Sequence, residues 1–218
     1  DALPICATAL IAAAELAGPG FINFRLTHAA RIAVLTAISE QGATFGRTPR
    51  NGQKVLVEFV SANPTGPLHV GHGRGAAYGD SIVRLLRAVG YQVCAEYYIN
   101  DAGRQMDILA TSIWLRYLEI CGEKFNFPSN AYRGSYVHKI AEQLYSEYSK
   151  DFFKTAELVF KNVPIDEPQG GNKEHHIDAL IAKAKSLLGT ADYEKIFEAG
   201  LNSILIDIKE DLSAFRVN

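Results

Sequence analysis

Residues 58–73 read Glu-Phe-Val-Ser-Ala-Asn-Pro-Thr-Gly-Pro-Leu-His-Val-Gly-His-Gly, and this stretch decides the fold of the chain. It follows an apolar run, Val55-Leu56-Val57, that is typical of a buried strand. Asn63-Pro64 and Gly66-Pro67 then end the strand, because each proline favours extended geometry in the residue before it. The sequence therefore predicts a strand that runs into a tight loop.

A helix is expected directly after this loop. From Gly73 onward apolar residues recur at helical spacing, and Gly90 stands where a C-terminal cap belongs. The N-terminus of a helix has unpaired N–H groups and a partial positive charge, so it attracts anions. Glycine at position 71 removes a side chain that would keep a nucleotide away from the backbone. His69 and His72 fall on one face of the first turn, where imidazoles can donate hydrogen bonds to phosphate oxygens.

The histidine pair could also be a surface feature, a core contact or part of a zinc site. Taken alone, a His-x-Gly-His sequence is a weak signal, since histidines are common on surfaces and in core contacts. A zinc site would need three or four ligands. Cys6, Cys94 and Cys121 are far apart in the sequence, and His175-His176 lies in a polar segment. The sequence therefore predicts no metal site.

A resemblance to a known family supports the nucleotide interpretation. Residues 61–72 resemble the first signature of class I aminoacyl-tRNA synthetases, whose His-Ile-Gly-His motif corresponds to His69-Val70-Gly71-His72. The wider segment, residues 57–68, is closely similar to the arginyl-tRNA synthetases among them. A second segment, Asn100-Asp101-Ala102-Gly103-Arg104-Gln105, resembles the Asn-Asp-x-Gly-x-Gln segment of the same enzymes.

The resemblance implies an α/β architecture in three parts. Residues 1–47 would form the end of an appended N-terminal α+β domain, and Ala17–Phe24 resembles the end of that domain. Residues 48–122 would form the first half of the class I synthetase Rossmann-like nucleotide-binding fold. Residues 123–218 would form a mainly helical insertion, in which Lys209-Glu210-Asp211-Leu212 also fits the family.

Local patterns agree with this division. Phe21–Leu26 alternates like a strand, and Ala29–Ile38 has helical spacing. Residues 2–14 are apolar, but no basic segment precedes them, so a helix of the N-terminal domain is favoured over a signal peptide. Val93–Ile99 predicts a second strand, parallel to the first because the helix between them is a crossover. Residues 162–172 predict a loop, which separates the first of three helical stripes from the other two: Val137, Ile140, Leu144, Tyr148; Ile177, Leu180, Ile181, Ala184, Leu187, Leu188; and Ile196, Phe197, Leu201, Leu205, Ile208, Leu212.

The resemblance implies an arginine–tRNA ligase. In this family the carboxylate of arginine attacks the α-phosphate of ATP and expels pyrophosphate, and arginine is then transferred to its tRNA. His69 and His72 would donate hydrogen bonds to phosphate oxygens, and Gly71 and Gly73 would let ATP approach the backbone. ATP is expected as a substrate with Mg²⁺, which is held mostly through phosphates and water, and no prosthetic group is expected.

Four residues are expected at the amino acid. By the resemblance, Ser61, Asn63 and His72 lie against arginine. Glu58 ends an apolar strand, where a carboxylate is costly unless a cation pairs with it. The guanidinium of arginine can supply that cation and bind bidentately. A salt bridge from Glu58 to a nearby lysine or arginine is the alternative.

Asp101 and Gln105 are further candidates. Both follow the second strand, in the region where ligands of open α/β sheets gather. Asp101 could equally be the N-cap of the next helix, a position for which aspartate is well suited. Both roles of Asp101 stay open at this point.

Some expected parts do not occur among these residues. Class I synthetases carry a second signature, Lys-Met-Ser-Lys or a near variant, and the 218 residues contain no such tetrapeptide. The chain starts at Asp1, and its only methionine is Met106. We therefore expect a fragment that lacks parts needed for activity. A non-catalytic binding module that keeps the nucleotide fold stays open as an alternative. A nucleotidyltransferase of the same superfamily would give no reason for Glu58-x-x-Ser61-x-Asn63.

The composition is typical of a globular cytoplasmic protein. Hydrophobic residues make up 48% and charged residues 21%, which argues against disorder. The net charge is −2 and no basic cluster stands out, so tRNA binding follows from the resemblance and not from charge. Three cysteines without framework spacing predict reduced thiols. No segment reaches the length of a membrane span, so no membrane partner is expected.

Overall fold

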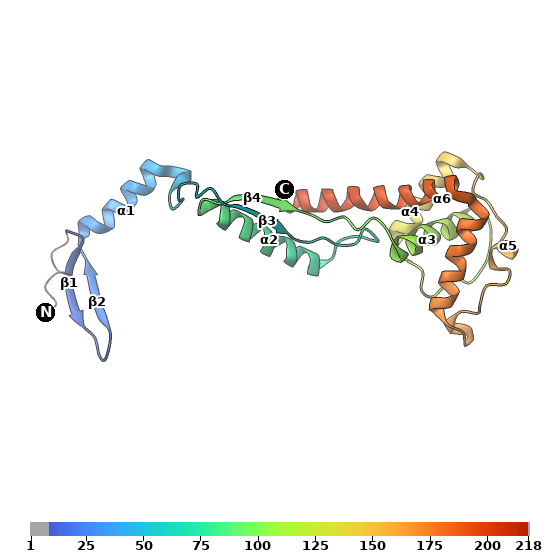
Figure 1. Cartoon of the computed structure of the whole chain (residues 1–218), viewed down its shortest axis with the longest axis horizontal. Helices are drawn as coiled ribbons and strands as arrows, with labels where there is room; N and C mark the ends of the chain where they lie inside the picture. Colours follow the sequence, from blue (N-terminus) through green and yellow to red (C-terminus); the bar gives the residue numbers. More distant parts are fainter. Residues whose placement is uncertain (1–8, 218) are drawn as a thin grey trace. The chain divides into compact units, whose positions relative to one another are not determined.

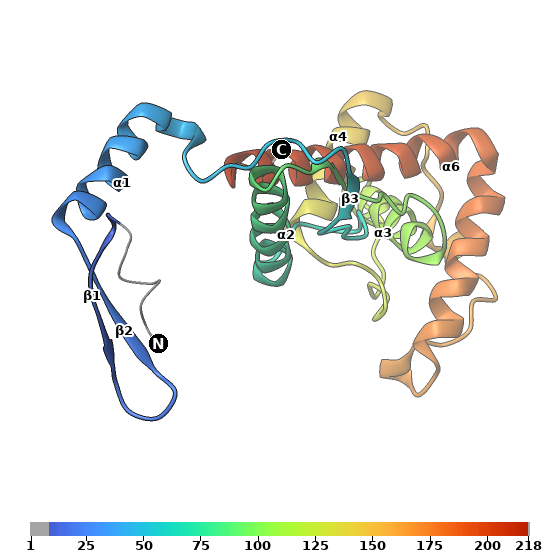
Figure 2. The same cartoon turned by 60° about the vertical axis from the view of Figure 1, so that its left-hand side comes forward.

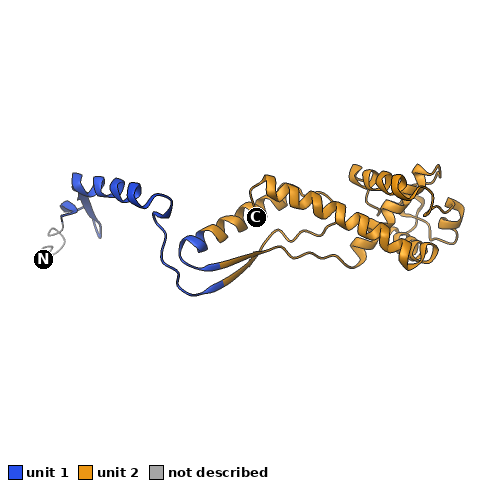
Figure 3. Ribbon diagram, turned by 90° about the horizontal axis from the view of Figure 1, so that it is seen from above, with its two compact units in different colours: residues 1–54, 85–92 blue, residues 55–84, 93–218 orange. Residues whose placement is uncertain are grey.

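The structure is a computed structural model that describes residues 9–217. The chain divides into two compact units, residues 1–54 with 85–92, and residues 55–84 with 93–218 (Figure 3). The division at residues 47 and 122 that the resemblance implies stays a prediction. Each unit is described separately below.

The first unit contains a hairpin followed by a helix (Figure 1). Strand β1, Ile11–Leu16, pairs antiparallel with β2, Ile22–Leu26. Helix α1, His28–Gln41, begins after Thr27, whose hydroxyl accepts a hydrogen bond from the Ala30 N–H at 3.1 Å. A short 3₁₀ turn, η2, spans Gly42–Thr44. The predicted strand before residue 27 and the helix after it are confirmed.

The helix predicted for residues 2–14 is wrong for the part that the structure describes. Residues 11–14 belong to β1, since their backbone groups pair with β2. An apolar run of this length does not by itself distinguish a strand from a helix, and the pairing strand decides. The remainder of the predicted helix, together with Cys6, lies outside the described residues.

The predicted strand–loop–helix–strand order is present. Strand β3, Lys54–Glu58, is followed by α2, Val70–Ala88, and β4, Gln92–Glu96. The Gln92 N–H donates to the Gln53 carbonyl, and the Phe59 N–H donates to the Glu96 carbonyl. The residue numbers of the paired positions increase in the same direction along both strands. Strands β3 and β4 are therefore parallel, with α2 as the crossover.

Helix α2 begins at Val70, so His72 lies in its first turn, as predicted. One detail of the β3–α2–β4 segment differs from the sequence prediction. The strand predicted as buried is half-exposed, and the Leu56 side chain is 60% exposed. Within residues 9–217, β3 pairs only with β4, so its surface is not covered as in a larger parallel sheet.

Close backbone packing at two glycines sets the position of α2. At Gly79 an added Cβ would lie 2.2 Å from Cγ of Phe59, so the helix packs directly against the residue that follows β3. Gly90 ends the helix with φ +90°, and an added Cβ there would lie 2.2 Å from the Pro49 carbonyl oxygen. The N–H of Gly90 donates to the Arg87 carbonyl, and the Tyr91 N–H donates to the Leu86 carbonyl, as in a Schellman cap. The predicted cap is confirmed.

The rest of the second unit is helical. Its helices are α3, Arg104–Ile120; α4, Ser135–Tyr148; α5, Ala156–Phe160; and α6, Lys173–Ala214, with a 3₁₀ turn, η3, at Glu167–Gln169. Helix α3 is buried along most of its length and packs against α4 and α6. The indole N–H of Trp114 donates to the Phe152 carbonyl at 2.9 Å. This helical core is the main hydrophobic core of the described residues.

Helix α6 carries both of the last two predicted stripes. Its backbone leaves helical geometry at Gly189, with φ +72° and ψ 175°, and Figure 2 shows the change of direction. Glycine has no Cβ and adopts this conformation readily, so the break falls where the sequence permits it. The loop predicted for residues 162–172 is confirmed apart from the short turn η3.

Asp166 fixes this loop to the segment before α4. It is 7% exposed, and its carboxylate accepts hydrogen bonds from the Ser129 N–H at 2.7 Å, the Ser129 hydroxyl at 2.6 Å and the Glu167 N–H at 2.8 Å. Burial alone would raise the pKa of Asp166, but the bonds from Ser129 and Glu167 outweigh it and hold the pKa below the ordinary value.

We expect Asp166→Asn to lower the free energy of unfolding by about 1.5–3 kcal/mol at pH 7, since an amide N–H₂ would face a donor. The carboxylate contribution is fully present above the ordinary Asp pKa of about 3.9 and is lost as the pH falls through the lower folded pKa. Urea unfolding from pH 7 to pH 2 measures both effects. Asp207→Asn, at an exposed position in α6, is the control. Equal stability of the two variants at pH 7 would contradict the role of Asp166.

None of the helices within residues 9–217 combines the length and apolar character that crossing a membrane requires.

Candidate functional site

The loop between β3 and α2 leaves the strand through an unusual backbone turn. Val60 has φ +66° and Ser61 has φ +39°. A positive φ at a β-branched residue is a true outlier and costs about 1–3 kcal/mol. The Ser61 hydroxyl accepts a hydrogen bond from the Tyr98 N–H at 3.1 Å, which fastens this turn to the segment after β4. Backbone strain of this kind gathers at functional sites, and here it lies at the start of the predicted signature.

Asn63 joins the two segments that carry the resemblance. Its side-chain N–H₂ donates to the Gln105 amide oxygen at 2.7 Å, and its oxygen accepts from the Asn100 side chain at 3.2 Å. All three side chains are exposed. The structure therefore brings together two predicted site residues that are 42 positions apart. Asn100 belongs to the second segment, but its direct contact with Asn63 has no signal in the sequence.

The first turn of α3, which carries Gln105, is anchored to α6. The Arg104 guanidinium donates to the Asp178 carboxylate at 2.7 Å and to Glu174 at 2.5 Å. Two hydrogen bonds from one guanidinium to two carboxylates restrict its orientation more than a single contact would. Because Arg104 precedes Gln105 directly, these bonds also limit the movement of the backbone at Gln105.

The sequence places the two histidines of the motif on one face of a turn, and in the structure their rings are stacked. Their ring centroids lie 3.8 Å apart with an interplanar angle of 20°. The His69 backbone N–H donates to Nδ1 of His72 at 3.3 Å, and the Gly71 N–H donates to Nδ1 of His69 at 3.1 Å. A neutral imidazole that accepts at Nδ1 carries its proton on Nε2. Both rings are therefore left with an Nε2–H that can donate to a ligand.

The charge state of His72 agrees with this tautomer. Burial, followed by repulsion from His69, lowers the pKa of His72 below its ordinary value. At pH 7 the ring is therefore neutral. A neutral ring keeps Nδ1 as an acceptor for the backbone and presents a single donor at Nε2.

The two glycines of the motif differ in what surrounds them. A Cβ at Gly71 would lie 2.9 Å from Cε1 of His69, so a side chain there would displace the histidine. A Cβ at Gly73 would meet nothing within 4 Å. Packing within the protein therefore explains the glycine at 71 and gives no reason for the glycine at 73. Open space at Gly73 agrees with the predicted approach of a ligand.

Glu58 and Asp101 do not join this network. Glu58 is exposed at the end of β3, and within the described part of the chain no lysine or arginine forms an ion pair with it. The alternative of a local salt bridge therefore finds no partner in residues 9–217. Of the two roles left open for Asp101, the structure does not support the N-cap role, since the N-cap of α3 is Gly103 with φ +89°. Glycine takes this position because it tolerates a positive φ.

Two tyrosine hydroxyls that the sequence did not indicate also contact the loop. Tyr97 donates to the Ala62 carbonyl at 2.7 Å, and Tyr136 donates to the Thr65 carbonyl at 2.7 Å. Tyr97 follows β4 and could have been considered from its place after the strand. Tyr136 lies in α4, 71 positions from its partner, and no periodic pattern predicts the contact.

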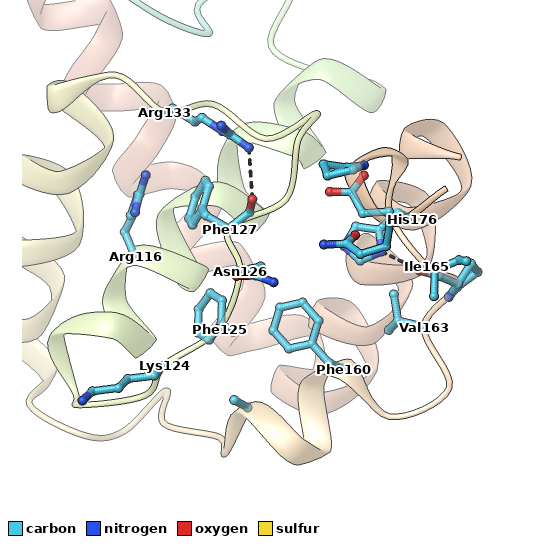
Figure 4. Close-up of a pocket in the computed structure, with 15 residues that line it drawn as sticks. Arg116, Lys124, Phe125, Asn126, Phe127, Arg133, Phe160, Val163, Ile165 and His176 are labelled. Atoms are coloured by element: carbon cyan, nitrogen blue, oxygen red, sulfur yellow. Dashed lines mark hydrogen bonds between the residues drawn. The ribbon is translucent and has the colours of Figure 1, made fainter. Parts of the chain in front are cut away.

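A separate hollow of about 840 Å³ lies in the helical part. Figure 4 shows Phe125 and Phe160 among the aromatic residues that line it, with the cations Arg116 and Lys124 nearby. None of the predicted site residues lines this hollow. Across residues 9–217, no group of three or more His, Cys, Asp or Glu side chains could hold a metal ion, and Cys94 and Cys121 are free thiols.

Comparisons with known proteins agree on one family. Residues 34–163 match the family model described as tRNA synthetases class I (R), catalytic domain. The chain is 57% identical over 212 residues to the arginine–tRNA ligase of Thioalkalivibrio sulfidiphilus, covering 97% of this chain and 36% of that protein. It is 53% identical over 204 residues to the arginine–tRNA ligase of Legionella pneumophila strain Corby, covering 93% and 35%.

A solved structure gives a similar result. The Thermus thermophilus arginyl-tRNA synthetase matches 97% of this chain and 29% of its own chain, with a TM-score of 0.52 and 25% identity. The chain thus spans about a third of the length of the curated relatives it matches.

Proposed function

The chain belongs to the family of class I tRNA synthetases (R), and from this membership we propose that it acts in arginine–tRNA ligation. The proposed reaction activates L-arginine with ATP to arginyl-adenylate and then transfers arginine to its tRNA. The use of ATP follows from the family. Mg²⁺ with the ATP, a cytoplasmic location and tRNA contacts that lie mostly outside these 218 residues are parts of the same proposal.

The observation that best supports activation chemistry is the tautomer of the stacked histidines. Backbone N–H groups occupy Nδ1 of both His69 and His72, which leaves two Nε2–H donors at the start of α2. Attack of the arginine carboxylate on the α-phosphate builds negative charge on phosphate oxygens while pyrophosphate leaves. Donors that are oriented before the reaction stabilise that charge without reorganisation. The helix N-terminus adds a partial positive charge in the same place.

The chain's own residues are expected to bind arginine beside the histidines. Asn63 is held between Gln105 and Asn100, so its amide has one orientation before the substrate arrives. Ser61 and His72 would complete the contacts to the amino acid. Glu58 is proposed for the guanidinium, since it is exposed and no cation of the described residues pairs with it. Asp101 stays a possible further contact.

The metal ion is expected to arrive with the nucleotide. The described residues offer no cluster of acidic or imidazole ligands. Mg²⁺ commonly keeps several waters and binds through substrate phosphates, so we propose that it enters as a magnesium–ATP complex. When bound, the ion neutralises phosphate charge.

Arginine-dependent exchange of pyrophosphate into ATP in the presence of tRNA, followed by arginylation of that tRNA, tests the proposal in the full-length protein that contains this sequence. Exchange that requires arginine, and is not supported by lysine, is the expected result. Equal exchange with other amino acids, or none with arginine, would contradict it.

Glu58→Gln tests the arginine contact in the same protein. We expect arginine binding to weaken by about 1.5–3 kcal/mol, the scale of a hydrogen bond to a charged group, with ATP binding nearly unchanged. Citrulline is a neutral analogue of arginine, so the preference for arginine over citrulline should fall by a similar factor. Glu96→Gln changes another exposed carboxylate, at the end of β4, and serves as the control. Unaltered arginine binding would assign Glu58 a structural role.

A further inference from the structure

The loop that carries Asn63 and His69 has no regular secondary structure and is held by two tyrosine hydroxyls. Tyr97 donates to the Ala62 carbonyl and Tyr136 donates to the Thr65 carbonyl, each at 2.7 Å. These two carbonyls lie on either side of Asn63-Pro64. The Tyr97 bond comes from the segment directly after the neighbouring strand, whereas the Tyr136 bond comes from the helical part of the unit.

The surroundings of Tyr136 are shaped to let its ring reach the loop backbone. A Cβ at Gly134 would lie 2.2 Å from Cε1 of Tyr136, and a Cβ at Gly66 would lie 3.0 Å from its hydroxyl oxygen. Side chains at either position would push the ring away from Thr65. Burial, followed by the nearby Tyr132, raises the pKa of Tyr136 to about 12, so the hydroxyl keeps its proton and acts as a donor at neutral pH.

A movement of Thr65 would be passed directly to Asn63. The Thr65 N–H donates to the Asn63 carbonyl at 2.8 Å, so the two backbones form one tight turn. On the other side of Thr65, Leu68 packs against the hydrophobic core of the helices, and His69 follows. The Thr65 carbonyl is thus a point at which the helical part holds the segment between the two candidate site residues by a hydrogen bond.

We propose that Tyr136 is a positioning residue for the site, which fixes the Thr65 carbonyl and through it the placement of Asn63 and His69 for arginine activation. The inference rests on the proposed function of this site. Catalysis that depends on bringing two anionic groups together is sensitive to small displacements of the groups that hold them. The helical part therefore contributes to the reaction through the hydrogen bond from Tyr136 to Thr65.

Tyr136→Phe removes the hydroxyl and keeps the ring. In the full-length protein we expect kcat/KM for arginine-dependent pyrophosphate exchange to fall about ten-fold, mainly through kcat, which corresponds to loss of one hydrogen bond. The KM for ATP should change little. Tyr117→Phe is the matched control, because the buried Tyr117 hydroxyl donates to the Ser149 carbonyl at 2.5 Å and accepts from the Phe152 N–H at 3.3 Å, and both partners lie outside the loop. If the two variants show equal exchange kinetics while the wild type is active, the positioning role of Tyr136 is refuted and the proposed function is not.

Hydrogen exchange measures the same contact without relying on activity. In Tyr136→Phe the backbone amides of residues 63–69 should exchange faster than in the wild type, while in Tyr117→Phe they should not. Unchanged protection of this segment in Tyr136→Phe would show that the hydroxyl does not hold the loop. A wild type that lacks arginine-dependent exchange would instead refute the proposed function, and the amide measurement would still decide whether Tyr136 holds the loop.

Discussion

His72→Ala is expected to lower the rate of arginyl-adenylate formation about 10²–10³-fold in the full-length protein, the usual effect of removing one preorganised donor. In the structure the Nε2–H of His72 is fixed because the His69 backbone N–H occupies Nδ1. The donor is aimed before the substrates bind, so its contribution falls mainly on the transition state. The affinity for ATP should therefore change far less than the rate. Single-turnover measurements of adenylate formation at saturating ATP separate the two quantities.

His138→Ala is the control for this experiment, because His138 is an exposed histidine in α4 that lies outside the signature loop. It should leave the rate unchanged. His69→Ala should also reduce the rate, and it should alter His72, since the two rings are stacked. The effects of the two substitutions are therefore not expected to add. Adenylate formation at the wild-type rate in the double variant His69→Ala/His72→Ala would refute the assignment of both histidines.

The parts of the fold that local signals determine were predictable from the sequence. Proline and glycine mark the end of β3, the helical period marks α2, and Gly90 marks the end of that helix. The parallel pairing of β3 and β4 follows from the crossover helix between them. These features depend on residues close together in the chain, so they can be recognised from a single sequence.

Features that depend on distant contacts were not predictable in this way. Residues 11–14 form a strand because β2 pairs with them, although their apolar composition also fits a helix. The exposure of Leu56 depends on how many strands pair in the described sheet. The side chain of Asp101 is suited to an N-cap, but α3 begins after Gly103, which has a positive φ. The course of the backbone in three dimensions decides which residue becomes the N-cap.

The same distinction between local and distant contacts holds for the candidate site. Residue types and spacing predicted that His69 and His72 share one face of a turn, whereas the role of Asn63 came from the resemblance. The contact of Asn63 with Gln105 joins the loop after β3 to the first turn of α3 and became visible only in the structure. The tautomers of the histidines likewise depend on backbone N–H directions that a sequence does not contain.

The 218-residue chain by itself is expected to show no detectable arginine-dependent exchange of pyrophosphate into ATP. It carries the first signature, but it contains no Lys-Met-Ser-Lys sequence whose lysines would meet the leaving pyrophosphate. It also spans only 36% of the length of its Thioalkalivibrio relative. In the structure of this chain, Asn63 and His69 are exposed to solvent. Water weakens electrostatic stabilisation by raising the local dielectric constant, so the donors that remain contribute little to the rate.

A folded chain is the necessary control for an expected lack of activity. Trp114 is the single tryptophan and is 1% exposed, so blue-shifted fluorescence would report that the helical core has formed. Weak binding of ATP and arginine is expected even then, since few contacts offset the entropy of association. The full-length protein, assayed in parallel together with its tRNA, should exchange pyrophosphate readily. Robust exchange by the folded 218-residue chain would show that these residues carry the whole reaction, and that the second signature is not needed for it.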